Sequence, residues 1–179
     1  MTQPMPGEMT PQEKKARMIR VNHAGEYGAL RIYEGQLRIL GKSPKGDLLR
    51  HMLAQEKEHL EKFEKLIIEH RVRPTLLSPL WHGLGYALGA LTATMGEKTA
   101  MACTVAVEEV IDDHYAKQEQ ELPESESDFK TLIHKCREEE LEHRDIGLAN
   151  GAEQATAYPL LKGAIKAGTK LAIWLSERV

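Results

Sequence analysis

The fold of this chain is decided by residues 49–66, which read LRHMLAQEKEHLEKFEKL. Residues three or four positions apart lie on one face of an α-helix, and in this stretch such a face is mostly apolar. The face consists of Leu49, Met52, Glu56, His59, Phe63 and Leu66. Glu56 and His59 therefore lie among core residues, whereas Lys57 and Glu58 point to solvent. We predict a helix that brings Glu-x-x-His into the core of a helical bundle.

The motif occurs a second time, at Glu140 and His143, again on an apolar helical face. A lone glutamate precedes each copy: Glu26 lies 30 residues before Glu56, and Glu108 lies 32 residues before Glu140. A four-helix bundle that binds two metal ions uses this set of residues, with a Glu from each of two helices and Glu-x-x-His from each of the other two. The repeated pattern therefore predicts a dinuclear metal site.

The chemistry of these residues favours bound cations. Periodicity alone does not distinguish Glu108 from Glu109, but in either case four glutamates face one core, at a cost of several kcal/mol each if they are ionised and unpaired. Two divalent cations balance four carboxylates, and neutral imidazoles add ligands without charge. Such a site suits iron or manganese better than zinc, and the spacing does not distinguish the first two. We expect Asn22 and Asp112, one turn from Glu26 and Glu108, to hydrogen-bond the histidines.

The overall composition is that of a globular helical protein. The chain has 179 residues, of which 41% are hydrophobic and 28% charged, and its formal net charge of −3 gives no basis for nucleic-acid binding. Two cysteines without a Cys-x-x-Cys motif fit a reducing compartment, and the first residues do not form a secretory signal. We predict a loose tail over residues 1–10 and a single all-α, ferritin-like domain over 11–179. Its helices are expected at about 11–40, 47–70, 97–121, a fourth ending near 147, and 157–178.

Residues 74–96 contain no Asp, Glu, Lys or Arg. The segment is long enough to cross a bilayer, but its Gly, Pro and Thr residues argue against this, and a ferritin-like bundle needs a crossover between its second and third helices here. We expect an apolar crossover helix whose outer face contacts the membrane and whose small residues permit close approach. The last segment pairs Leu161 and Ile165 with Lys162 and Lys166, which predicts an amphipathic helix near anionic lipid. Simple packing on the bundle is the alternative for both.

Six short segments connect the chain to a known family: RVNHAGEYGA (20–29), QEKEH (55–59), RVRPT (71–75), ACTVAVEE (102–109), EELEHRDIG (139–147) and LSER (175–178). With them the chain resembles the demethoxyubiquinone hydroxylases, the di-iron monooxygenases of ubiquinone biosynthesis, over roughly residues 16–179. The resemblance implies two iron ions and favours Glu108 over Glu109. It implies that the metal ligands are Glu26, Glu56, His59, Glu108, Glu140 and His143.

The resemblance also implies an activity, namely hydroxylation of the ring of a polyprenyl methoxy-methyl-benzoquinol by O2 activation at two bridged irons. Because such a substrate resides in a bilayer, we expect peripheral membrane contact through residues 74–96 and 157–178. The sequence lacks the mitochondrial presequence of eukaryotic members, so we expect a bacterial form at the cytoplasmic face of the cell membrane. Other proteins of ubiquinone biosynthesis are expected as partners.

Two further residues match family positions beside the site. Tyr115 is expected to hydrogen-bond a ligand carboxylate or the quinol, with a core aromatic as the alternative. His114 is interpreted as a proton relay, with a surface histidine as the alternative. Two other functions compete with the monooxygenase: a ferritin-like protein that stores iron or scavenges peroxide, and a non-catalytic lipid carrier. The uncharged segment at 74–96 favours the monooxygenase, because neither storage nor peroxide removal requires an apolar crossover.

Overall fold

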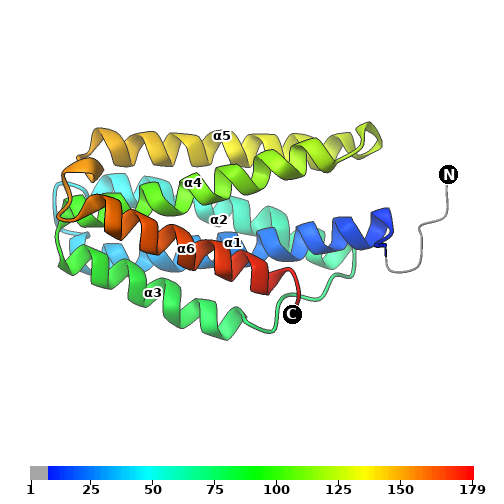
Figure 1. Cartoon of the computed structure of the whole chain (residues 1–179), viewed down its shortest axis with the longest axis horizontal. Coiled ribbons are helices and arrows are strands. Elements are labelled where there is room, and N and C mark those ends of the chain that lie inside the picture. The colour runs from blue at the N-terminus through cyan, green and yellow to red at the C-terminus, as the bar shows by residue number, and fades with distance from the viewer. Residues whose placement is uncertain (1–7) are drawn as a thin grey trace.

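The computed structural model describes residues 8–179, which form six α-helices and two short 3-10 helices and contain no strand (Figure 1). The α-helices are α1 (Pro11–Leu40), α2 (Gly46–Glu69), α3 (Ser78–Thr94), α4 (Glu97–Glu121), α5 (Ser127–Ala149) and α6 (Tyr158–Ser176). The 3-10 helices are η1 (Glu124–Glu126) and η2 (Ala152–Gln154). Most of the predicted tail, residues 1–7, lies outside the described residues, and the division into a tail and one domain stays a prediction.

The long helices begin and end within about two residues of the predicted positions. The first helix starts with a capping box, in which the Thr10 side chain accepts from the backbone N–H of Glu13 and the Glu13 carboxylate accepts from the backbone N–H of Thr10. Pro11 occupies the first helical turn, where its missing N–H costs nothing. The predicted range 97–121 matches α4, and the predicted range 47–70 differs from α2 by one residue at each end.

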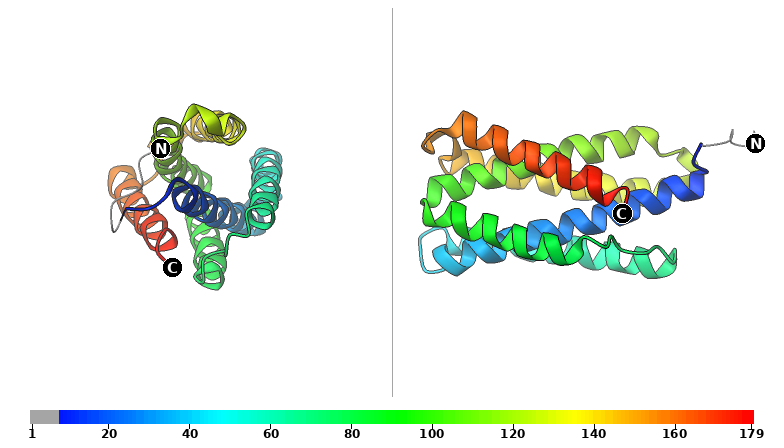
Figure 2. Two further views of the ribbon diagram at one scale, coloured as in Figure 1. Left: turned by 90° about the vertical axis from the view of Figure 1, so that its right-hand side faces the viewer. Right: turned by 60° about the horizontal axis from the view of Figure 1, so that its bottom comes forward.

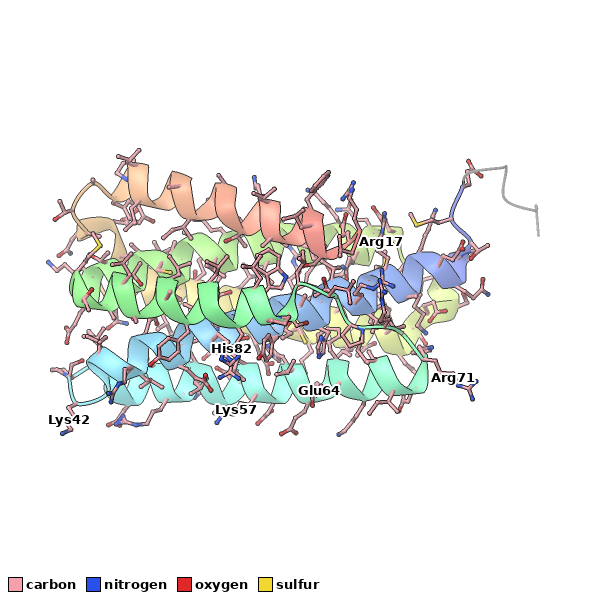
Figure 3. The ribbon with its side chains drawn as sticks, turned by 90° about the horizontal axis from the view of Figure 1, so that it is seen from below. Arg17, Lys42, Lys57, Glu64, Arg71 and His82 are labelled. Atoms are coloured by element: carbon pink, nitrogen blue, oxygen red, sulfur yellow. The ribbon has the colours of Figure 1, made fainter. Side chains whose placement is uncertain are left out.

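Four helices form the bundle, and two lie outside it. Seen end-on, α1, α2, α4 and α5 surround the core, while α3 and α6 lie on the outer side of α1 and α4 (Figure 2). The connection between α2 and α4 runs the length of the bundle through α3, so the expected crossover helix is present. This is an all-α, ferritin-like arrangement. Lys57 and Glu64, on the outer side of α2, are exposed as predicted for residues off the apolar face (Figure 3).

The contact between α3 and α1 depends on glycine. A Cβ atom built on Gly89 would lie 1.9 Å from the backbone oxygen of Ile32, and one built on Gly35 would lie 2.2 Å from the backbone oxygen of Tyr86. The two backbones therefore approach more closely than any side chain permits, as expected from the small residues of this segment. A hydrogen bond of 2.7 Å between the Tyr27 hydroxyl and His82 Nδ1 also joins the two helices.

The contact between α6 and α4 differs from the prediction. Ile165 is buried in the core, and Lys162 and Lys166 lie 2.5 and 2.7 Å from the two carboxylate oxygens of Glu109 on α4. The prediction that these residues face lipid is therefore wrong, because the lysines are paired across the helix interface. The large apolar side chains that α6 exposes are Leu160, Leu171 and Trp174. Among the described residues no helix combines the length and apolar character needed to cross a membrane.

Candidate metal centre

Six predicted residues converge at the middle of the bundle, each exposed by at most 1%. Glu26 comes from α1 and Glu108 from α4, whereas α2 and α5 each contribute one Glu-x-x-His motif. They form two groups, within each of which the ligand atoms lie within 4.8 Å of one another. The groups are Glu26, Glu56, His59 and Glu140, and Glu56, Glu108, Glu140 and His143. Because Glu56 and Glu140 belong to both, the arrangement has the form of two adjacent ion positions with two shared carboxylates.

The atoms that point into this space lack hydrogen-bond partners. They are Oε2 of Glu26 and Glu108, both carboxylate oxygens of Glu56 and Glu140, and Nδ1 of both histidines. Buried polar atoms without partners are rare in proteins, since each costs free energy. His59 Nδ1 lies 3.2 Å from Glu26 Oε2, and His143 Nδ1 lies 3.2 Å from Glu56 Oε1. Neighbouring ligands of an ion bound octahedrally at about 2.1 Å are separated by roughly 3 Å, so this donor set fits metal ions.

The pKa values of the cluster show how strongly the charges interact. Burial and the neighbouring Glu140 raise the pKa of Glu56 to about 8. Burial alone acts to raise the pKa of Glu140, but His143 and His59 outweigh it and hold that pKa at about 2. Burial acts to lower the pKa of His143, but Glu140 and Glu56 outweigh it and raise that pKa to about 11. The cluster can thus balance its carboxylates with protons or with cations, and cation binding would release protons.

The histidines are held by residues other than those predicted. The Nε2 atom of His143 lies 2.9 Å from Gln55 Oε1, and Nε2 of His59 contacts the carboxylate of Glu139. Both Nδ1 atoms therefore face the centre of the cluster. The expectation for Asn22 and Asp112 is wrong: Asn22 donates to Gln118 at 2.8 Å, and Asp112 accepts from Arg137 at 2.6 Å. The spacing of Asn22 and Asp112 from the glutamates did not show that their side chains bond residues of neighbouring helices other than the histidines.

Two tyrosines fix the lone glutamates. The Tyr115 hydroxyl donates to Glu26, as expected for a ligand carboxylate, and the Tyr33 hydroxyl donates to Glu108 Oε1 at 2.7 Å. Each tyrosine reaches across from the helix that carries the other glutamate. Tyr33 is buried and was not predicted as a site residue. The available signal was its spacing, since each tyrosine follows its own helix's glutamate by seven residues.

A cavity of about 460 Å³ leads from the outside to the cluster between α1, α3, α4 and α6. Its lining is mostly apolar, and Glu26 and Tyr115 belong to it, whereas Glu108 does not. At one end the indole N–H of Trp81 on α3 donates to Ser176 Oγ on α6 at 2.9 Å. The cavity therefore reaches the cluster on the side of Glu26.

His114 is half-buried and also lines this cavity, and its role stays a prediction. The side-chain amide of Gln118 donates to its Nε2 at 2.7 Å. Burial, together with the positive charges of Lys117 and Arg17, lowers the pKa of His114 to about 4. The ring is therefore neutral at physiological pH.

Residues 13–176 match the model of the family described as Ubiquinone biosynthesis protein COQ7. The chain belongs to this family. A 3-demethoxyubiquinol 3-hydroxylase of Rhodospirillum rubrum is 59% identical over 176 residues, which cover 98% of this chain and 83% of the relative. An NADPH-dependent 3-demethoxyubiquinone 3-hydroxylase, mitochondrial, of Homo sapiens is 55% identical over 167 residues, covering 91% of this chain and 77% of the relative. A 5-demethoxyubiquinone hydroxylase, mitochondrial, of Saccharomyces cerevisiae is 38% identical over 180 residues, covering 91% of this chain and 77% of the relative.

Membership of the COQ7 family confirms the resemblance drawn from the six sequence segments. It concerns the chain as a whole, so the roles of individual residues stay predictions. The structure adds what the motifs lack, namely the position of each side chain relative to the cluster and the cavity.

Proposed function

We propose that this protein hydroxylates the ring of a polyprenyl demethoxyubiquinol with O2 at two iron ions held in the four-helix bundle. Family membership and the names of the relatives support the reaction class, a hydroxylation in ubiquinone biosynthesis. The single observation that carries the proposal beyond the family is the apolar cavity whose lining includes Glu26 of the carboxylate–histidine cluster. When bound, two ferrous ions supply electrons and a binding site for the reductive activation of O2.

The proposed ligands divide between the two ions according to the two groups of residues. Glu26 and His59 belong to one position, Glu108 and His143 to the other, and Glu56 and Glu140 to both. Four carboxylates balance the charge of two divalent ions. The set offers mostly oxygen with one imidazole per ion, which suits iron.

The cavity is proposed to hold the quinol ring next to the position at Glu26. Apolar side chains such as Leu88, Ile111 and Ile173 line it and exclude water around the ring. Tyr115 orients Glu26 by donating to it. The neutral ring of His114 is proposed to hydrogen-bond a hydroxyl of the quinol and to relay its proton, since it is a titratable group in a mostly apolar lining that also includes Glu26.

The polyprenyl tail is proposed to leave the cavity between α3 and α6, toward a membrane. These two helices and the residues that flank α3 contribute most of the large apolar side chains that the described residues expose: Leu76, Leu80, Leu84, Leu91, Met95, Leu160, Leu171 and Trp174. Exposed apolar groups of this size commonly mark a contact surface. We propose peripheral association with the cytoplasmic face of a bacterial membrane, where other proteins of ubiquinone biosynthesis meet the same substrate.

The proposal is tested by anaerobic reconstitution with ferrous iron, followed by demethoxyubiquinol, NADPH and then ¹⁸O2. The reaction consumes one O2 and two reducing equivalents, so mass spectrometry should find one ¹⁸O atom on the ring and the other in water. Iron bound at two per chain without an oxygenated product would overturn the monooxygenase and favour the storage or peroxide-scavenging alternative. Iron well below two per chain would overturn the dinuclear site.

A further inference from the structure

Gln55 and Glu139 occupy equivalent places in the two motif copies, because each stands immediately before the glutamate of a Glu-x-x-His motif. Each side chain crosses the interface between α2 and α5 and contacts the histidine of the other copy. Gln55 Oε1 lies 2.9 Å from His143 Nε2, and the Glu139 carboxylate contacts His59 Nε2. The crossed arrangement is thus the same on both sides, and only the acceptor differs.

The difference is one of charge. A carboxylate is an acceptor with a full negative charge, whereas the side-chain amide of Gln55 is neutral. The other oxygen of Glu139 lies 3.5 Å from Lys135 Nζ, so Glu139 is fixed between a lysine and His59. An acceptor behind a ligand imidazole raises the basicity of the nitrogen that faces the metal, and a charged acceptor does so more strongly. Nδ1 of His59 is therefore a stronger electron-pair donor to a metal ion than Nδ1 of His143.

The stronger donor lies on the side of the cavity. His59 groups with Glu26, which lines the cavity, whereas His143 groups with Glu108, which does not. The metal position nearest the proposed substrate thus contains His59, the histidine that contacts the carboxylate of Glu139. Nothing in the repeated ligand motif itself distinguishes the two positions, since each offers one lone glutamate, one histidine and the same two shared carboxylates.

We infer that the two metal positions are inequivalent and that Glu139 makes the position at Glu26 and His59 the tighter one. Glu139 and Gln55 are positioning residues, which act on the ions through the histidines they contact. The inference rests on the proposed metal site and deepens it. It predicts which of the two positions is filled first. It attributes that order to one difference between the two sides, the carboxylate of Glu139 behind His59 and the amide of Gln55 behind His143.

The test is anaerobic titration of the full metal-free chain with Co²⁺, followed by calorimetry and by paramagnetic proton NMR. Each histidine bound through Nδ1 should give one shifted, exchangeable Nε2–H signal. The signal that Gln55→Glu displaces belongs to His143, and the signal that Glu139→Gln displaces belongs to His59. With one equivalent of Co²⁺ the native chain should show the His59 signal. Glu139→Gln should weaken the first binding step about 10- to 100-fold.

The double variant Gln55→Glu/Glu139→Gln exchanges the two side chains and keeps the composition. In it the first Co²⁺ equivalent should bind at the position of His143. Gln55→Glu alone should narrow the gap between the two steps, so the inference does not depend on the folding of one variant. Glu138→Gln, at an exposed neighbour, is the matched control and should change neither step. Equal signals at one equivalent in the native chain, or a first ion that stays on His59 in the double variant, would overturn the inference. Absence of Co²⁺ binding would instead overturn the metal site.

Discussion

The half of the molecule built from α1 and α2 repeats in the half built from α4 and α5, and the two halves differ in what surrounds them. Inside, the crossed contacts match: a tyrosine seven residues after each lone glutamate bonds the glutamate of the other half. Outside, α3 meets α1 through glycines, whereas α6 meets α4 through the lysine pairs of Glu109. The comparison teaches that the repeated motif specifies the same set of ligand-type side chains in both halves, and that the cavity on one side of the core is formed with the added helices α3 and α6.

The largest effect is expected where the two halves share a residue. Glu140→Ala removes a carboxylate that belongs to both ion positions, whereas Glu108→Ala removes one that belongs to a single position. We expect Glu140→Ala to reduce iron to well below one per chain and turnover by more than about 100-fold, since loss of a ligand is more severe than loss of its outer partner. Glu108→Ala should retain close to one ion. Metal analysis and turnover measure both, and equal iron content in the two variants contradicts the shared role. Glu138→Ala is the exposed control.

The glycine contact on one half is tested by Gly89→Ala. The added methyl group overlaps the backbone oxygen of Ile32, so α3 must move, and we expect the free energy of unfolding to fall by about 2–3 kcal/mol. Gly83→Ala is the matched control on the same helix, since nothing beyond the neighbouring residues and the backbone of its own helix lies within 4 Å of its Cβ position. There the better helix propensity of alanine should raise stability by about 0.5–1 kcal/mol. Urea titration of both variants checks the signs, and a stable Gly89→Ala variant contradicts the close approach.

The exposed apolar side chains of α6 offer a separate test of the membrane proposal. Leu171→Ser with Trp174→Ser removes two exposed side chains without touching the core, and we expect the affinity for phospholipid vesicles to fall about tenfold, as partial burial of two such groups predicts. Flotation with vesicles of mixed neutral and anionic lipid measures this. Lys57→Ser, on the far side at α2, is the control. Unchanged flotation of the double variant would remove α6 from the proposed membrane contact.

The smallest effect is expected from the two tyrosines, which compare the halves directly. Tyr115→Phe removes the hydrogen bond to Glu26 beside the cavity, and Tyr33→Phe removes the bond to Glu108 away from it. A hydrogen bond of this kind contributes about 0.5–1.5 kcal/mol, so Tyr115→Phe should lower turnover about threefold to tenfold. Tyr33→Phe should lower stability by a similar free energy with less effect on turnover. The same loss of turnover in both variants would contradict the proposal that the substrate reacts at the position beside Glu26.

The sequence predicted most of the core and less of what lies around it. Glu26, Glu56 and His59 sit on apolar helical faces, and periodicity of three or four places such residues reliably because it reports which side of a helix is buried. Glu139 lies off that face, so periodicity gives no reason to place it beside the histidine of the other helix. In the structure α2 and α5 are close enough that a residue next to a ligand reaches the neighbouring helix. The direction of a side chain at a helix interface depends on the neighbouring helix. The periodicity of one helix carries no information about that neighbour.

A related reason explains the error on α6. Charged residues beside an apolar face suggested contact with anionic lipid, but Lys162 and Lys166 meet Glu109 on α4. Glu109 was considered only as an alternative to Glu108 as a metal ligand, and its paired role was missed. A lysine that pairs with a distant carboxylate and a lysine that faces lipid headgroups have the same sequence pattern. Only the packing of the two helices distinguishes them.

The glycine contact between α1 and α3 has a mechanical consequence for substrate entry. At Gly89 and Gly35 the backbones of α3 and α1 meet with no side chain between them, so α3 forms the more rigid wall of the cavity. On the opposite wall α6 packs on the core through Ile165, and its polar contacts are the rotatable lysine side chains and the hydrogen bond between Trp81 and Ser176. We therefore expect a long polyprenyl chain to enter and leave by outward motion of α6, with the end near Ser176 opening first.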